Sequence, residues 1–160
     1  MTTNITKMPS VGEKAPDFTL PSNSGDSITL SALKGKPVVV YFYPKDNTPG
    51  CTTEAKGFQE HISDFDQAGA VVLGISPDGV DSHCKFAEKY GLRFALLADE
   101  GHSVAQQYGV WVEKNNYGKK YMGVQRATFL VDKDGTLAYV WPKVKPDGHP
   151  EEVLAALSSI

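Results

Sequence analysis

The sequence lacks several features by which function is often recognised. It has only two cysteines and no C-x-x-C pair, which excludes a thioredoxin-type dithiol site and a zinc ribbon. Its four histidines are scattered without metal-ligand spacing, and it has no glycine-rich dinucleotide loop, so neither a metal nor a flavin cofactor is expected. Neither sign of charge dominates. A net charge of -3 gives no electrostatic reason to expect a nucleic acid or an acidic membrane as a partner.

Long hydrophobic runs are also missing. The longest apolar runs, at residues 38–43 and 70–75, have the length of strands and are too short to span a bilayer. Residues 1–18 contain no apolar stretch of the kind that a signal peptide needs, so we expect a cytoplasmic protein. A chain of 160 residues with 41% hydrophobic residues predicts one domain, spanning residues 1–160, with a single core.

The expected elements alternate between buried strands and helices, which predicts an α/β fold of thioredoxin-like topology. After a polar arm over residues 1–16, strands are expected at 37–43, 71–75 and 94–97, with helices at 51–68, 80–90 and 102–108. A polar loop over 113–123, a hairpin of strands at 127–131 and 136–141, and a closing helix from Pro150 complete the chain. Because strands joined through helices pair in parallel and a hairpin adds antiparallel strands, we expect a central mixed sheet flanked by helices.

Cys51 stands where a cysteine can be reactive. It follows a buried strand and a turn-rich loop and opens a predicted helix, whose positive end favours a thiolate over a thiol. Thr48 lies close enough for its hydroxyl to bond the sulfur or a molecule beside it, and Pro44 and Pro49 stiffen the loop. From these residues alone, a reactive thiol and an inert buried cysteine are equally good interpretations.

The stretch Y-P-K-D-N-T-P-G-C-T-T-E resembles the P-x-x-x-T-x-x-C motif of the peroxiredoxins, with matches at Pro44, Thr48 and Cys51. The version T-P-G-C-T-T-E is similar to that of the bacterioferritin comigratory protein, or peroxiredoxin Q, subfamily. The similarity continues through A-P-D-F-T-L, G-V-Q-R-A-T-F-L-V-D and W-P-K-V-K-P-D-G-H. It implies a catalytic role for Arg126, which without the resemblance would be interpreted as a surface charge at the end of a strand.

The resemblance implies a thiol-dependent peroxidase that reduces hydrogen peroxide and organic hydroperoxides. Cys51 would attack one oxygen of the O–O bond and become a sulfenic acid, while Thr48, Arg126 and the Cys51 N–H donate hydrogen bonds to the developing charge. Pro44 would shield the sulfenic acid from water. Glu54 also matches the subfamily pattern, but capping of the helix N-terminus explains it, so we leave it out of the expected site. The resemblance further implies thioredoxin as the reductant and a monomer.

The sequence indicates less directly which thiol is the resolving one, the thiol that forms a disulfide with the Cys51 sulfenic acid. Many members of this subfamily carry a second cysteine in the same helix, at the position that Lys56 occupies here, and this departure leaves Cys84 as the remaining candidate. Some members resolve from the following helix, where Cys84 falls near the border between the apolar and charged faces. An inert, half-buried Cys84 stays open as an alternative. So do a one-cysteine peroxiredoxin reduced by an external thiol and a thiol-based redox sensor.

Overall fold

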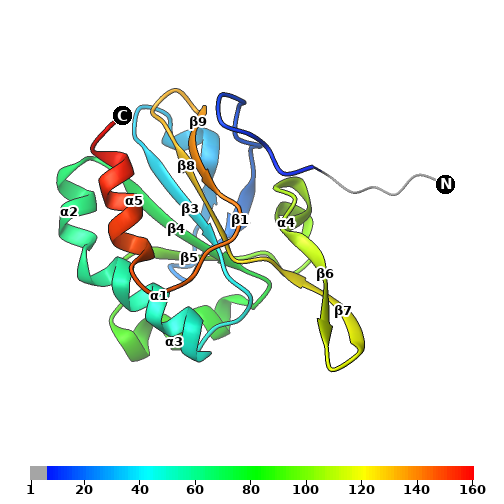
Figure 1. Cartoon of the computed structure of the whole chain (residues 1–160). Helices are drawn as coiled ribbons and strands as arrows, with labels where there is room; N and C mark the ends of the chain where they lie inside the picture. Colours follow the sequence, from blue (N-terminus) through cyan, green and yellow to red (C-terminus); the bar gives the residue numbers. More distant parts are fainter. Residues whose placement is uncertain (1–6) are drawn as a thin grey trace.

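A computed structural model describes residues 7–160 (Figure 1), so residues 1–6 of the arm predicted over 1–16 lie outside the described part. The centre of the fold is a five-stranded sheet with the order β5-β4-β3-β8-β9. Its strands are β3 (Val38–Phe42), β4 (Val71–Ser76), β5 (Ala95–Ala98), β8 (Ala127–Val131) and β9 (Leu137–Trp141). Strands β3, β4 and β5 are parallel, and β8 and β9 add antiparallel pairs. This arrangement confirms the predicted mixed sheet of thioredoxin-like type.

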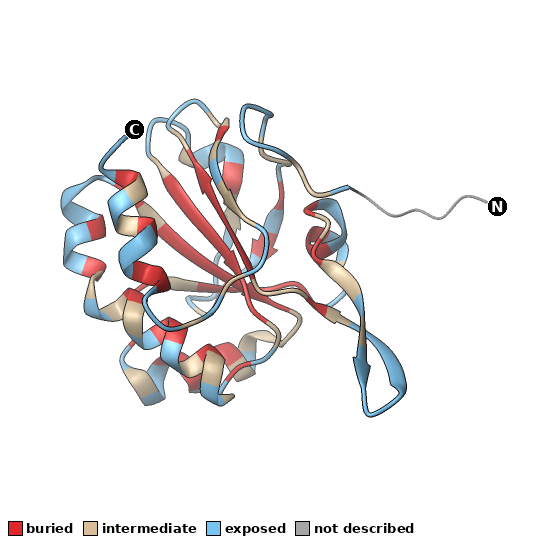
Figure 2. Cartoon of the chain, viewed as in Figure 1, coloured by how far each residue is buried: buried red, intermediate tan, exposed pale blue. Residues whose placement is uncertain are grey.

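Helices and short strands cover both faces of the sheet, whose central strands are the most buried part of the chain (Figure 2). The elements on one face are α1 (Pro49–Glu60), α2 (Ile62–Gln67), α3 (Val80–Tyr90) and α5 (His149–Leu157). Those on the other are the 3-10 helix η1 (Leu30–Leu33), α4 (Ser103–Gln107), β1 (Thr19–Pro21) and β2 (Ser27–Thr29). The sheet divides the single predicted core into two clusters. Alternate residues of β3 pack into each: Val39 and Tyr41 with the first layer of elements, Val40 and Phe42 with the second.

Several helices begin and end at the expected glycines and prolines. Helix α3 has the predicted bounds, and Gly91 ends it in the left-handed conformation with φ 63°. Gly69, with φ 75°, follows α2 in the same way. Pro150 lies in the first turn of α5, where its missing N–H costs no hydrogen bond. None of the helices within residues 7–160 combines the length and the apolar character that a membrane span requires.

The single helix predicted over residues 51–68 is instead two helices, α1 and α2, which meet at His61. The backbone of His61 leaves the helical region, with φ -102° and ψ 11°. Its ring nitrogen Nε2 lies 2.9 Å from Glu151 Oε1 on α5. Close by, a Cβ added to Gly57 would come within 2.8 Å of Pro150 Cγ, so α1 approaches α5 closely. The break thus occurs where α1 packs against a distant part of the chain, which helical periodicity alone cannot show.

The prediction of a loop over residues 113–123 is wrong. The segment forms an antiparallel hairpin of β6 (Trp111–Asn116) and β7 (Lys119–Val124), which projects from the body of the molecule (Figure 1). Its two turn residues, Tyr117 and Gly118, both have positive φ, 53° and 81°, as a two-residue type I′ turn needs. Most side chains of the hairpin are exposed, so its strands lack the apolar alternation by which a half-buried strand is recognised.

Candidate active site

Cys51 lies in the first turn of α1, just beyond the end of β3. Its side chain is a free thiol and is 1% exposed. Thr48 is the residue that precedes the first helical residue, Pro49, and its side chain makes no capping bond. The first intrahelical bond runs from the Thr52 N–H to the Thr48 carbonyl (2.8 Å), which leaves the N–H of Cys51 among the donors that the helix itself does not use. These donors and the helix dipole favour negative charge on the sulfur and on an oxygen bound beside it.

Arg126 brings a positive charge to Cys51 from the neighbouring strand. It immediately precedes β8, and its Nη2 lies 3.4 Å from Cys51 Sγ while its Nη1 donates to Glu54 Oε1 at 2.8 Å. Burial by itself lowers the pKa of Arg126, but Glu54 and Cys51 raise that pKa above its ordinary value. The guanidinium therefore stays charged and is fixed through two of its nitrogens. Gly50 leaves room for it, since a Cβ there would lie 3.1 Å from Nη2.

Glu54 is a member of this cluster that the sequence interpretation missed. A capping carboxylate would lie at the surface, whereas Glu54 is 0% exposed and points inward to Arg126. Its second oxygen, Oε2, has no hydrogen-bond partner within residues 7–160. Burial raises the pKa of Glu54 to about 7, although the charge of Arg126 lowers it. One sequence signal for this role was the place of Glu54 in the subfamily stretch T-P-G-C-T-T-E. A second was the need of Arg126, if buried at the site, for an anionic partner.

Glu54→Gln should change the pH dependence of stability. Since folding raises the pKa of Glu54 from 4.5 to about 7, the folded state holds its proton more tightly, and the wild type loses stability as pH rises between these values. The amide cannot titrate. The free energy of unfolding of the wild type relative to the variant should therefore fall by roughly 2 kcal/mol between about pH 5 and about pH 8. Urea unfolding of the reduced proteins measures this, and a difference that does not change with pH would contradict the raised pKa.

Thr48 and Pro44 lie on the loop between β3 and α1, and Thr48 does not make the contact with the sulfur that the sequence suggested. The Thr48 hydroxyl donates to the Lys45 carbonyl at 2.9 Å rather than bonding the sulfur. Because its only proton is used there, the Thr48 oxygen is left as an acceptor, which differs from the donor role expected from the sequence. Pro44 is half-buried and follows directly on the strand that leads to the Cys51 loop.

Cys84 is not brought to Cys51. It is an exposed free thiol on α3, and its Sγ donates to the Asn23 carbonyl at 3.2 Å, in the turn between β1 and β2. Cys51 is buried in the first turn of a different helix and contacts Arg126. A disulfide requires the two Cβ atoms to approach within about 4.5 Å, so joining these thiols needs the backbone of one or both segments to move.

The projecting hairpin contributes one further charge that the sequence interpretation missed. Lys114 of β6 is half-buried and interacts electrostatically with both Arg126 and Cys51. Burial lowers the pKa of Lys114, the positive charge of Arg126 lowers it further, and Cys51 opposes these effects. Lys114 therefore adds positive potential near the thiol, which is a favourable setting for a thiolate.

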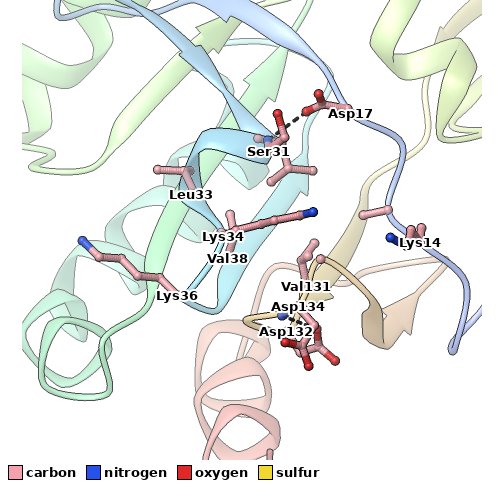
Figure 3. Close-up of a pocket in the computed structure, with 13 residues that line it drawn as sticks. Lys14, Asp17, Ser31, Leu33, Lys34, Lys36, Val38, Val131, Asp132 and Asp134 are labelled. Atoms are coloured by element: carbon pink, nitrogen blue, oxygen red, sulfur yellow. Dashed lines mark hydrogen bonds between the residues drawn. The ribbon is translucent and has the colours of Figure 1, made fainter.

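A pocket at the other end of the sheet is separate from this cluster (Figure 3). It lies where β3 begins and β8 ends, between charged side chains that include Lys14, Lys34 and Asp132. One of its carboxylates, Asp17, accepts a hydrogen bond from the Ser31 N–H at 2.8 Å. None of its lining residues is a cysteine, so it offers no thiol chemistry.

Comparison with known proteins shows which family this chain is part of. The sequence profile of the AhpC/TSA family matches residues 11–140, which is most of the chain. The chain belongs to the AhpC/TSA family. A protein named putative peroxiredoxin bcp, from Coxiella burnetii, is 56% identical over 147 residues, which cover 92% of this chain and 97% of the relative. Peroxiredoxin Bcp of Bacillus subtilis is 48% identical over 150 residues, covering 94% and 96% of the two chains.

Solved structures of the same kind of AhpC/TSA protein superpose closely on this chain. The bacterioferritin comigratory protein of Xanthomonas campestris gives a TM-score of 0.88 at 42% identity, covering 94% of this chain and 98% of the other. A PrxQ of Xylella fastidiosa gives 0.90 at 35% identity, covering 96% and 98%. These similarities confirm the resemblance to the Bcp and peroxiredoxin Q proteins, and they support a thiol-dependent peroxidase activity for this member of the family.

Proposed function

We propose that this chain reduces hydrogen peroxide and organic hydroperoxides at Cys51, then forms an intramolecular disulfide with Cys84, and is returned to the dithiol by thioredoxin. The observation that carries the proposal is the contact between the buried Cys51 thiol and the Arg126 guanidinium, 3.4 Å apart at the start of α1. This contact lies in a chain of the AhpC/TSA family, most of whose length matches the family profile.

In the first step the peroxide is reduced and Cys51 is oxidised by two electrons. The thiolate attacks one oxygen, the S–O bond forms as the O–O bond breaks, and the electron pair leaves on the second oxygen, which takes up a proton to give water or an alcohol. The Arg126 guanidinium and the Cys51 N–H stabilise the charge that develops on the leaving oxygen. The Thr48 oxygen accepts the peroxide O–H, and Glu54 holds Arg126 in place.

In the second step the sulfenic acid is resolved within the chain. The Cys84 thiol attacks the Cys51 sulfur, the S–S bond forms, and the hydroxyl leaves as water with the thiol proton. Thioredoxin then reduces this disulfide by thiol–disulfide exchange and becomes oxidised itself. Since Cys51 is buried and Cys84 is held on the Asn23 carbonyl, one or both local segments must loosen before the sulfurs meet.

Cys84→Ser tests the resolving step. The variant should keep the first peroxide reduction, lose most thioredoxin-supported turnover, and accumulate sulfinic Cys51 faster under excess peroxide, because no thiol traps the sulfenic acid. Consumption of NADPH through thioredoxin reductase and thioredoxin measures turnover, and mass spectrometry measures the oxidation state of Cys51. Full turnover by Cys84→Ser would favour a one-cysteine peroxidase reduced by an external thiol. Stoichiometric oxidation of the wild type without turnover would favour a redox sensor.

We also propose that the protein acts as a monomer in the cytoplasm. Both cysteines of the proposed disulfide come from one chain, so the cycle requires no second subunit. Between turnovers both must return to free thiols, which is the state in which the structure holds them. A reducing compartment maintains that state.

A further inference from the structure

A buried hydrogen-bond network connects the loop that leads into α1 with the first turns of α3. Its centre is the carboxylate of Asp46, which is 7% exposed. Asp46 Oδ1 accepts from the Tyr43 hydroxyl at 2.5 Å, and Oδ2 accepts from the Ser82 hydroxyl at 2.8 Å. The same Oδ2 lies 2.7 Å from Nδ1 of His83, whose side chain is 0% exposed. Two consecutive residues of α3 are thus bound to one carboxylate of the loop.

The hydrogen-bond partners of His83 show that this contact carries a proton. Its Nε2 lies 2.9 Å from the Leu97 carbonyl, which can only accept, so Nε2 carries a hydrogen. Its Nδ1 faces an Asp46 oxygen that already accepts from Ser82, so a second proton must lie between Nδ1 and Oδ2. His83 and Asp46 therefore form a hydrogen-bonded pair in which both partners are buried. Separating such a pair is costly because each partner is left buried without the other.

Further contacts tie the same loop to α3 and its approach. The Asp46 N–H donates to Asp78 Oδ2 at 2.7 Å, just before α3 begins. Near the end of the helix, the Tyr90 hydroxyl and Lys89 Nζ donate to Asn47 Oδ1 at 3.1 and 3.3 Å. These outer bonds are more exposed, and water can replace them. The contact between Asp46 and His83 is the buried part of the connection.

We propose that the Asp46–His83 pair is a latch whose opening sets the rate at which Cys84 reaches oxidised Cys51. This inference rests on the proposed Cys51–Cys84 disulfide. Cys84 directly follows His83, and its thiol is held on the Asn23 carbonyl while His83 is anchored in the interior. Cys84 cannot leave that position far without drawing His83 from Asp46. His83 is in this sense a positioning residue that acts through Cys84.

The latch affects disulfide formation and peroxide reduction differently. The peroxide step can take place while the latch is closed, because that step needs no movement of α3. When it opens, Ser82 and His83 are released together, and the first turns of α3 can unwind. The latch therefore slows disulfide formation without slowing peroxide reduction, and it lengthens the time in which sulfenic Cys51 is exposed to a second peroxide.

Two substitutions at His83 distinguish the effect of its bond to Asp46 from the effect of its packing in the core. In His83→Gln the side-chain amide can still reach the Leu97 carbonyl but does not replace Nδ1, so the bond to Asp46 is lost. In His83→Asn the amide nitrogen lies near the position of Nδ1, so the bond to Asp46 is kept and that to Leu97 is lost. Rapid quenching and mass spectrometry of Cys51 as thiol, sulfenic acid, sulfinic acid and disulfide give the rate of each step.

We expect His83→Gln to form the disulfide about tenfold faster than the wild type and to accumulate less sulfinic Cys51, with the rate of the first peroxide step unchanged. His83→Asn should remain close to the wild-type rates. Ser82→Ala, which removes one bond of the latch and leaves the core filled, should shift the disulfide rate in the same direction by a smaller factor. It keeps the test decisive if a His83 variant does not fold.

The matched control is Leu137→Ala, which removes a buried side chain from β9 on the core that does not contain Cys51. It should lower stability without accelerating disulfide formation. Disulfide rates of His83→Gln and Ser82→Ala equal to the wild-type rate, or an equal acceleration in Leu137→Ala, would overturn the latch. Failure of the wild type to form any Cys51–Cys84 disulfide would instead overturn the proposed function, so the two failures are distinguishable.

Discussion

Cys51→Ser is expected to abolish peroxide reduction and to leave the fold intact. Serine has nearly the same shape as cysteine and fits a position that is 1% exposed. Its hydroxyl, however, stays protonated at neutral pH, so there is no anion to attack the O–O bond and no sulfur to accept the oxygen. Peroxide consumption in the presence of thioredoxin, thioredoxin reductase and NADPH measures the loss. Circular dichroism and thermal unfolding verify that the variant is folded.

The matched control for this substitution is Cys84→Ser, which removes the other thiol. It should consume about one equivalent of peroxide per chain in a single turnover, whereas Cys51→Ser should consume none. Substantial peroxide turnover by folded Cys51→Ser would remove Cys51 from the mechanism.

Arg126→Ala should slow the first peroxide step by roughly 100-fold or more. The guanidinium contacts the reacting sulfur at 3.4 Å and stabilises charge that develops on the leaving oxygen, and loss of one such donor has an effect of about this size in other enzymes. A smaller fraction of Cys51 should be thiolate at neutral pH, because a nearby cation favours the charged form. Stopped-flow kinetics of the peroxide step and the ultraviolet absorbance of the thiolate measure the two effects.

Arg126→Lys separates charge from geometry at this position. A lysine keeps the positive charge but cannot hold Cys51 and Glu54 through two nitrogens of one planar group. We therefore expect a thiolate fraction closer to that of the wild type, with a peroxide step that remains slow. If Arg126→Ala had wild-type peroxide kinetics and an unchanged thiolate absorbance, Arg126 would be only a charge at the end of a strand.

The sheet was predictable because its signals are local. The apolar run that became β3 and the helix that Gly91 ends can both be recognised from neighbouring residues. The break at His61 was not predictable in this way, because it depends on the packing of α1 against Glu151 and Pro150 of α5. The β6–β7 hairpin was missed because most of its side chains are exposed, so its strands show no apolar alternation.

In the candidate site, too, local features could be predicted from the sequence and features that depend on tertiary packing could not. The place of Cys51 at the start of a helix follows from the sequence around it. The approach of Arg126 to that cysteine depends on the pairing of β8 with β3, and a role for Arg126 at the thiol was expected only from the resemblance to the peroxiredoxins. Whether Glu54 points outward as a cap or inward to Arg126 depends on the same pairing. His83 carried a usable signal, since it lies on one helical face with Phe86 and Ala87, which predicts a buried imidazole.

The most direct test of the proposed cycle is mass mapping of non-reduced peptides after the reduced protein has reacted with one equivalent of peroxide. The cycle predicts a single new cross-link, between the peptides that contain Cys51 and Cys84, formed within one chain. Non-reducing electrophoresis distinguishes it from a link between chains. Protein that shows only sulfinic Cys51, or only disulfides between chains, would contradict resolution of Cys51 by Cys84.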